Sequence, residues 1–144
     1  MADINLTFDS GVRDLELSDG KDRSVVVRFN PYDVMFIAAI MDAAEKLDAV
    51  QQKLTAFNGE SWREIYEACV DADKEMREIL DGIFNVPICE ALFPPGQSVH
   101  AIGNGFPVWA NLLVALLDHM DAGLDAEKAK AQTRIRKYSG KYKK

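Results

Sequence analysis

The spacing of hydrophobic positions divides the chain into a strand-like beginning and a helical remainder. Apolar and polar residues alternate over 4–8 and 12–17, with the two-residue period of a half-buried strand. Residues 24–29 are rich in valine and read as a third strand, and Asp19-Gly20 before them is a typical hairpin turn. We therefore predict a small antiparallel β-meander of two or three strands within residues 1–29.

After this segment the hydrophobic period lengthens to that of a helix. Asn30 suits an N-cap and Pro31 suits the first helical position, so we predict that a long helix begins here. Asn58-Gly59 predicts its end. Apolar residues between these points recur at steps of four and three, which predicts one buried seam: Phe36, Ile40, Ala43, Leu47, Val50, Leu54 and Phe57.

A second helix is predicted directly after the first. Ser61 and Glu64 form the pattern of a capping box, in which each side chain bonds a free backbone N–H of the first turn. Trp62 opens the apolar seam of this helix, and we expect Trp62 and Trp109 to pack in the core. Two helices of similar length joined by a short loop predict an antiparallel helical hairpin.

The remaining chain predicts three further elements. Residues 86–93 read as a short helix or turn, which Pro94-Pro95-Gly96 breaks. A strongly apolar helix follows from Trp109 to near Gly123, and residues 125–138 predict a last, polar helix. The fold class is accordingly mainly α (α+β): a helical hairpin plus a further apolar helix, with a small N-terminal antiparallel β-meander. We expect a single domain over 1–144, made of a β segment (1–29), a helical core (30–123) and a basic C-terminal helix or tail (124–144).

The stretch Gly103-Asn104-Gly105 raises the question of nucleotide binding. A dinucleotide fingerprint needs a third glycine and a preceding buried strand, and a P-loop needs Gly-Lys-Ser/Thr; the chain has none of these. Pro107 also removes an N–H group that a phosphate would need. We interpret this stretch as a sharp turn from which Pro107 starts the next helix.

Neither the acidic residues nor the histidines form a recognisable catalytic or metal-binding motif. The acids of the second helix include Glu67, Asp71, Asp73, Glu75, Glu78 and Asp81. Lys74 and Arg77 lie among them, as on a solvated helix face with internal ion pairs. His100 and His119 belong to no Glu-x-x-His motif, and nothing in the sequence orients a triad around His100 and nearby Ser98. We predict no catalytic residue, no metal and no cofactor, and hence a protein that is not an enzyme.

Composition places the chain among ordinary globular proteins. It has 144 residues, of which 48% are hydrophobic and 28% charged. No apolar run approaches the about 18 residues of a membrane span, and the N-terminus lacks the pattern of a secretory signal. Cys69 and Cys89 are not clustered, which is typical of reduced thiols. We expect a cytoplasmic protein that does not enter a membrane.

Charge is distributed very unevenly along the chain. Residues 127–144 hold eight Lys or Arg against one acid, a net charge of +7, whereas the other 126 residues hold 9 basic and 22 acidic side chains, a net charge of −13. A basic segment with interleaved tyrosines is compatible with single-stranded nucleic acid, with an acidic protein partner or with a solvated tail. The acidic body would repel a phosphate backbone, which argues against nucleic acid.

Several motifs together resemble a known family. The order is a strand segment, Asn30-Pro31-x-Asp33, a helical hairpin containing Asp73-x-Glu75-Met76-Arg77, a short helix with Cys89, and Pro107-x-Trp109-x-Asn111. Over residues 24–144 this resembles small proteins encoded in the tail-morphogenesis region of tailed phages and prophages of Gram-positive bacteria. The chain departs from that family at FPPGQSVHAIG (93–103).

The resemblance implies a tail assembly chaperone, which binds the tape-measure protein and recruits tail-tube subunits in the host cytoplasm without catalysis. The alternative is a structural virion subunit of the tail or connector, whose strand segment pairs between subunits of a homo-oligomer. We expect partner contacts through exposed parts of Val34, Met35 and Phe36 and through the basic segment at Arg134, Arg136, Lys137 and Tyr138. High salt should weaken a complex held by that segment.

Overall fold

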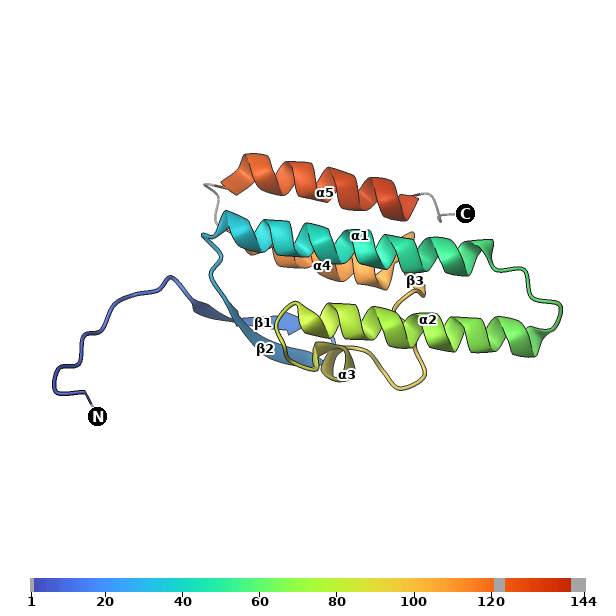
Figure 1. Ribbon diagram of the computed structural model, residues 1–144, viewed down its shortest axis with the longest axis horizontal. Helices are drawn as coiled ribbons and strands as arrows, with labels where there is room; N and C mark the ends of the chain where they lie inside the picture. Colours follow the sequence, from blue (N-terminus) through green and yellow to red (C-terminus); the bar gives the residue numbers. More distant parts are fainter. Residues whose placement is uncertain (1, 121–123, 141–144) are drawn as a thin grey trace.

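The computed structural model describes residues 2–120 and 124–140. Four of the helices are stacked, with α5 on one side of α1 and α4 and with α2 on the other side of α1; a β-hairpin covers one end (Figure 1). The elements are β1 (Arg13–Ser18), β2 (Ser24–Phe29), α1 (Val34–Ala56), α2 (Trp62–Gly82), α3 (Ile88–Leu92), β3 (Ile102–Gly103), β4 (Phe106–Pro107), α4 (Val108–Asp118) and α5 (Asp125–Gly140). The predicted mainly α (α+β) class, with a small antiparallel N-terminal sheet, is confirmed.

The N-terminal sheet has two strands. β1 pairs antiparallel with β2, and Leu17 and Val27 turn inward to the core. The strand predicted over 4–8 is wrong: this segment has no regular secondary structure and pairs with neither strand. Alternation of apolar and polar residues gives a segment one apolar and one polar face, but a strand also needs a neighbouring strand to accept its hydrogen bonds. No strand lies beside this segment.

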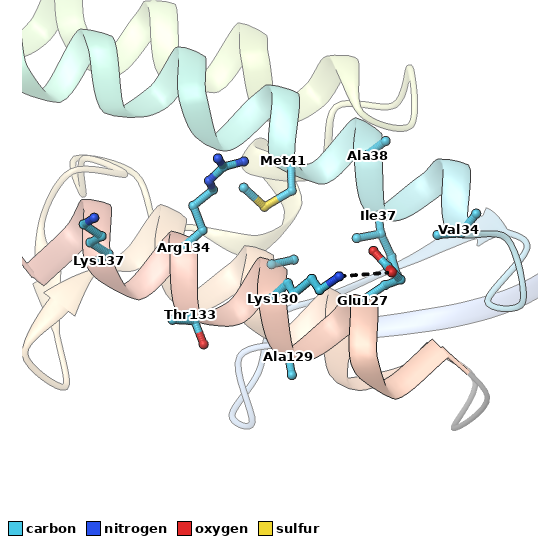
Figure 2. Close-up of a pocket in the computed structure, with 11 residues that line it drawn as sticks. Val34, Ile37, Ala38, Met41, Glu127, Ala129, Lys130, Thr133, Arg134 and Lys137 are labelled. Atoms are coloured by element: carbon cyan, nitrogen blue, oxygen red, sulfur yellow. Dashed lines mark ion pairs between the residues drawn. The ribbon is translucent and has the colours of Figure 1, made fainter.

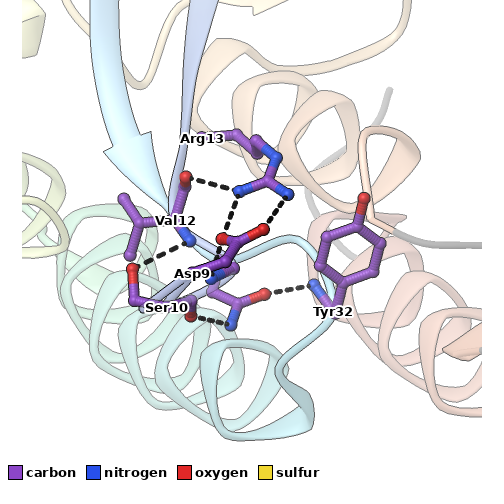
Figure 3. A network of polar contacts seen from close by, with 7 residues as sticks. Asp9, Ser10, Val12, Arg13 and Tyr32 are labelled. Carbon is purple, nitrogen blue, oxygen red and sulfur yellow. Dashed lines mark hydrogen bonds and ion pairs between the residues drawn. The ribbon is translucent and has the colours of Figure 1, made fainter. Parts of the chain in front are cut away.

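A network of polar contacts fixes the chain between segment 4–8 and β1 (Figure 3). The Asp9 carboxylate accepts two bonds from the Arg13 guanidinium, at 3.0 and 3.1 Å, and one from the Gly11 N–H at 2.8 Å. The Asn30 amide donates to the Ser10 carbonyl at 3.1 Å. Gly11 has φ +80°, and a Cβ there would lie 2.5 Å from the Asn30 amide nitrogen, so this turn requires glycine. We call these five residues the arm anchor, because they hold the base of the N-terminal segment, residues 2–8, which we call the arm.

We expect Asp9 to titrate far below an ordinary aspartate. The bond from Arg13, followed by the bond from Gly11, lowers its pKa from 3.8 to about 2. Because the folded value is the lower one, the carboxylate favours the anchored turn above pH 3.8, and that preference is lost as pH falls through about 2. Carboxyl NMR should show this pKa and its rise in Arg13→Gln. The pKa of Asp19 is lowered by the N–H groups of Lys21 and Arg23, so it should not change in this variant. If the pKa of Asp9 also stayed the same, the ion pair between Asp9 and Arg13 would be contradicted.

The long first helix begins later than its sequence predicts. Asp33 is the N-cap, and its carboxylate accepts the Met35 N–H at 2.9 Å. The Asn30 side chain instead accepts the Tyr32 N–H at 2.8 Å and closes a turn. The predicted start at Pro31 is therefore wrong. Asn30 and Asp33 both suit a cap, and the bond from Asn30 to the Ser10 carbonyl favours the second.

The helical hairpin of α1 and α2 is confirmed, together with its capping box. The Ser61 hydroxyl accepts the Glu64 N–H at 3.3 Å, and the Glu64 carboxylate reaches back to the Glu60 N–H at 2.8 Å. Trp109 is fully buried as predicted, and its indole donates to the Gln51 side chain at 3.1 Å. The core position predicted for Trp62 is wrong, since this side chain is 76% exposed.

The glycine-containing stretch before α4 is a structural turn. Asn104 and Gly105 have φ 55° and 84°, the two positive values of the tight turn that joins β3 to β4. This small hairpin was not predicted, although Asn-Gly is its usual sequence signal. Pro107 lies at the N-cap of α4 rather than in its first turn. The predicted end of that helix near Gly123 lies outside the described residues.

The predicted last helix is confirmed as α5, and it belongs to the packed body. Its Ala131 and Ile135 are buried among residues of the core, and the helix contacts α1 and α4. Its basic residues thus lie on a structured helix up to Gly140. Lys141, Lys143 and Lys144 lie outside the described residues.

Candidate protein-binding surface

An exposed aromatic stripe runs along the first half of α2. Trp62, Tyr66 and Val70 follow one another at steps of four, so they lie on one face of the helix. Trp62 is 76% exposed and Tyr66 57% exposed, and their rings meet edge to face with centroids 5.7 Å apart. Tryptophan and tyrosine in such positions are typical of protein interfaces, whereas single exposed aliphatic residues are common on any surface.

The stripe continues into a hollow between α2 and the segment after α3. Tyr66 and Val70 line it from the helix, and Phe93, Pro94 and Pro95 line it from the other side; its volume is about 550 Å³. Proline rings have little freedom, so this wall keeps its shape. We call the stripe and the hollow together the α2 surface.

Hydrogen bonds fasten the far wall of the hollow to α2. The Asp73 carboxylate accepts the Val99 N–H at 2.7 Å and bonds the Arg77 guanidinium at 2.9 Å. Arg77 also donates to the Gln97 carbonyl at 2.6 Å, and the His100 ring bonds the Cys69 carbonyl at 3.1 Å. A wall held in this way is preorganised, so a ligand does not have to order it on binding.

Two acids of α2 therefore do not belong to a solvated face. Asp73 holds the loop, and Asp81 accepts the Cys89 N–H at 3.0 Å and so positions α3. The interpretation of a solvated face is wrong for these two residues. Their partners lie 26 and 8 positions further along the chain, a distance at which helical periodicity carries no signal.

Both cysteines are free thiols. Burial raises the pKa of Cys89 far above its ordinary range, and the neighbouring Asp81 carboxylate raises it further. This thiol stays protonated at neutral pH and is a poor nucleophile.

Ser98 and His100 meet, but in an arrangement suited to holding the loop. The Ser98 hydroxyl lies 3.2 Å from His100 Nδ1, and the group beyond the other ring nitrogen is the carbonyl of Cys69. A catalytic triad places a carboxylate there, which stabilises the charged imidazole. Over residues 2–120 and 124–140, no three His, Cys, Asp or Glu side chains converge as a metal ion would require.

A second concave region lies between α1 and α5 (Figure 2). The apolar side chains of Val34, Ile37, Ala38 and Met41 form its α1 side, and α5 provides its other side; its volume is about 800 Å³. The α5 side includes Glu127, Lys130, Arg134 and Lys137, and the Lys130 ammonium lies 3.7 Å from the Glu127 carboxylate. Within the part of the chain that the structure describes, Arg134 and Lys137 form no ion pair. We call this region the α1–α5 groove.

The structure brings together three of the seven predicted contact residues: Val34, Arg134 and Lys137 line the α1–α5 groove. Met35 is exposed beside it. Phe36 is half-buried, because its ring stacks on Phe29 at 4.4 Å.

The other two predicted residues, Arg136 and Tyr138, face elsewhere on α5. Arg136 lies over the Phe106 ring at 5.9 Å, and Tyr138 is half-buried against the core. The predicted contact residues did not include four others that line the groove: Ile37, Ala38, Met41 and Lys130. A second apolar seam on α1, offset from the first, was the available signal, as were steps of four and three between the basic residues of α5.

Comparisons with known proteins add no relative to this description. The chain matches no protein-family model, and neither the curated proteins nor the solved structures contain a match. Among the described helices, none combines the length and the apolar character needed to cross a membrane.

Proposed function

We propose that this protein is a non-enzymatic assembly factor of a tailed phage or prophage, namely a tail assembly chaperone that binds tape-measure and tail-tube proteins in the host cytoplasm. The resemblance over residues 24–144 supports the family, and the α2 surface supports a binding role. The observation that carries the proposal is Trp62, exposed beside Tyr66 at the edge of a fastened hollow.

An amphipathic helix is the partner segment that fits this surface. Trp62, Tyr66 and Val70 form a ridge at steps of four, and such ridges pack into the grooves of a second helix. The hollow beyond the ridge accepts a large apolar side chain of that helix against Phe93 and Pro94. A tape-measure protein, which is long and helical, offers many such segments, and covering them before assembly prevents their aggregation.

Replacing Trp62 with Ala should weaken binding of a tape-measure fragment by at least about 30-fold, the loss that defines an interface hot spot. The free energy of unfolding should stay within about 0.5 kcal/mol of wild type, because the side chain is exposed. Titration calorimetry measures the first quantity and urea unfolding the second. Glu75→Ala, an exposed change on the opposite face of the same helix, is the matched control. If both variants bound the tape-measure fragment as tightly as wild type, Trp62 would not be part of the interface.

The partner itself is best identified by affinity purification from cells that express the phage late genes. Recovery of a tape-measure protein, together with absence of this chain from finished virions, would support the chaperone. Recovery within intact particles at fixed stoichiometry would instead favour a structural virion subunit. A salt series on the recovered complex then tests for contacts between opposite charges, since such contacts weaken as ionic strength rises.

A further inference from the structure

Residues 2–8 form an N-terminal arm that lies outside the helices and strands, and its apolar side chains are uncovered. Ile4, Leu6 and Phe8 are 76%, 86% and 83% exposed. In an extended backbone these three residues lie on one face and the polar residues between them on the other, because successive side chains point to opposite sides. A regular apolar face of this kind, left in water, is typical of a segment that binds another surface.

The arm anchor directs this segment away from its own molecule. Gly11 and Arg13 both donate to the Asp9 carboxylate, and Asn30 ties this turn to the chain that leads into α1. From this point the arm runs outward from the helices and the hairpin (Figure 1). The turn has its own bonds and a required glycine, so its direction does not depend on what the arm contacts.

The α1–α5 groove matches the arm in character, length and charge. Its α1 side is apolar from Val34 to Met41, a rise of about 10 Å along the helix. The apolar face of the arm, from Ile4 to Phe8, spans about 13 Å when extended. The groove side on α5 carries Lys130, Arg134 and Lys137 against one acid, Glu127, whereas the one charged side chain of the arm is that of Asp3.

We propose that the N-terminal arm of one copy lies in the α1–α5 groove of a second copy, which gives an arm-exchanged homodimer. Asn30 of the arm anchor lies four residues before Val34, so each arm leaves its molecule next to the start of a groove. When two copies exchange their arms about a two-fold axis, each groove holds the arm of the other copy. Both arms and both grooves are then covered. This proposal goes beyond the proposed function and uses a different surface, because the α2 surface contributes nothing to it.

Disulfide trapping between two different variants tests the proposal directly. One protein carries Leu6→Cys in the arm and the other Ala38→Cys in the groove; both positions are exposed, so both variants should fold. The background is Cys69→Ser, and Cys89 is buried. On mixing and mild oxidation we expect at least about tenfold more linked heterodimer than with Glu78→Cys on α2, because a disulfide needs its two Cα atoms within about 7 Å.

Further variants separate the possible occupants of the groove. A chain carrying both Leu6→Cys and Ala38→Cys should form linked dimers; a disulfide within one monomer would mean that the arm folds back on its own groove, and would overturn the exchange. Sedimentation of the full chain should show a dimer, which Leu6→Asp with Phe8→Asp converts to monomer. Arg134→Glu with Lys137→Glu should raise the dimer dissociation constant by at least about tenfold. A wild-type chain that is monomeric at every concentration would also overturn the proposal.

The same variants distinguish this proposal from the proposed function. Trp62→Ala should leave the sedimentation of the dimer unchanged, because Trp62 lies on α2 and not in the α1–α5 groove. A chain that dimerises but captures no tape-measure fragment would contradict only the proposed function. A chain that captures the fragment but remains monomeric would contradict only the arm exchange.

Discussion

Replacing Ile135 with Ala should lower the free energy of unfolding by about 2–5 kcal/mol, the usual range for this truncation in a core. The side chain is fully buried, and its helix α5 contacts both α1 and α4. Removing its methyl groups leaves a space that the two flanking helices cannot close without moving. Chemical denaturation followed by circular dichroism measures the effect, provided that the slope against denaturant stays constant.

The matched control for this prediction is Thr133→Ala. Thr133 lies on the same helix two positions away and is exposed, so its truncation should change stability by less than about 0.5 kcal/mol. Similar small effects of both variants would mean that the C-terminal segment is a solvated tail. In that case the α1–α5 groove would lose one side, and the arm-exchange proposal would lose its receiving surface.

The second strong effect is expected at the bond between Gln51 and Trp109. Both side chains are buried, and the indole N–H donates to the Gln51 carbonyl oxygen at 3.1 Å. Methionine has a similar shape but accepts hydrogen bonds weakly, so Gln51→Met leaves the buried indole N–H without an adequate partner. We expect a loss of about 1–3 kcal/mol in the free energy of unfolding.

A double-mutant cycle isolates this bond from the change in packing. Trp109→Phe removes the indole N–H, so adding Gln51→Met to it should cost less than the same change in wild type. Gln132→Met is a control, because its bond to Asp118 at 2.7 Å is solvent-exposed and worth little. Additive losses in the cycle would show that the bond contributes nothing beyond its packing. Urea unfolding followed by circular dichroism supplies all four free energies.

The two proposed surfaces divide the molecule into independent parts. The α2 surface belongs to the helical hairpin and the loop fastened by Asp73 and Arg77. The α1–α5 groove lies between α1 and the last helix. Self-association through the arm therefore leaves the aromatic stripe open, and a dimer would present two copies of it to a long helical partner. Two linked sites bind such a partner more tightly than one, if the partner reaches both.

Much of the fold follows from local features of the sequence. The steps of three and four set the helices, because one face of each must be apolar to pack. Ser61 and Glu64 begin α2 through bonds that involve only neighbouring residues. Asn104-Gly105 turns the chain before α4 because both residues tolerate positive φ. Such features need no knowledge of distant contacts.

Other properties depend on residues that lie far apart in the sequence. Trp62 and Trp109 both occupy apolar positions of helices, yet the first is exposed and the second is enclosed by the core. Segment 4–8 has the alternation of a strand, but no strand lies beside it to accept its hydrogen bonds.

The two candidate surfaces also depend on residues that lie far apart in the sequence. The role of Asp73 depends on Val99, and the α1–α5 groove depends on α5 reaching across to α1. The sequence by itself determined where the main helices form, because helix formation depends on residues within a turn or two of one another. The tertiary structure alone decided which apolar faces were covered and which stayed open to a partner, because burial depends on neighbours brought together only when the helices pack.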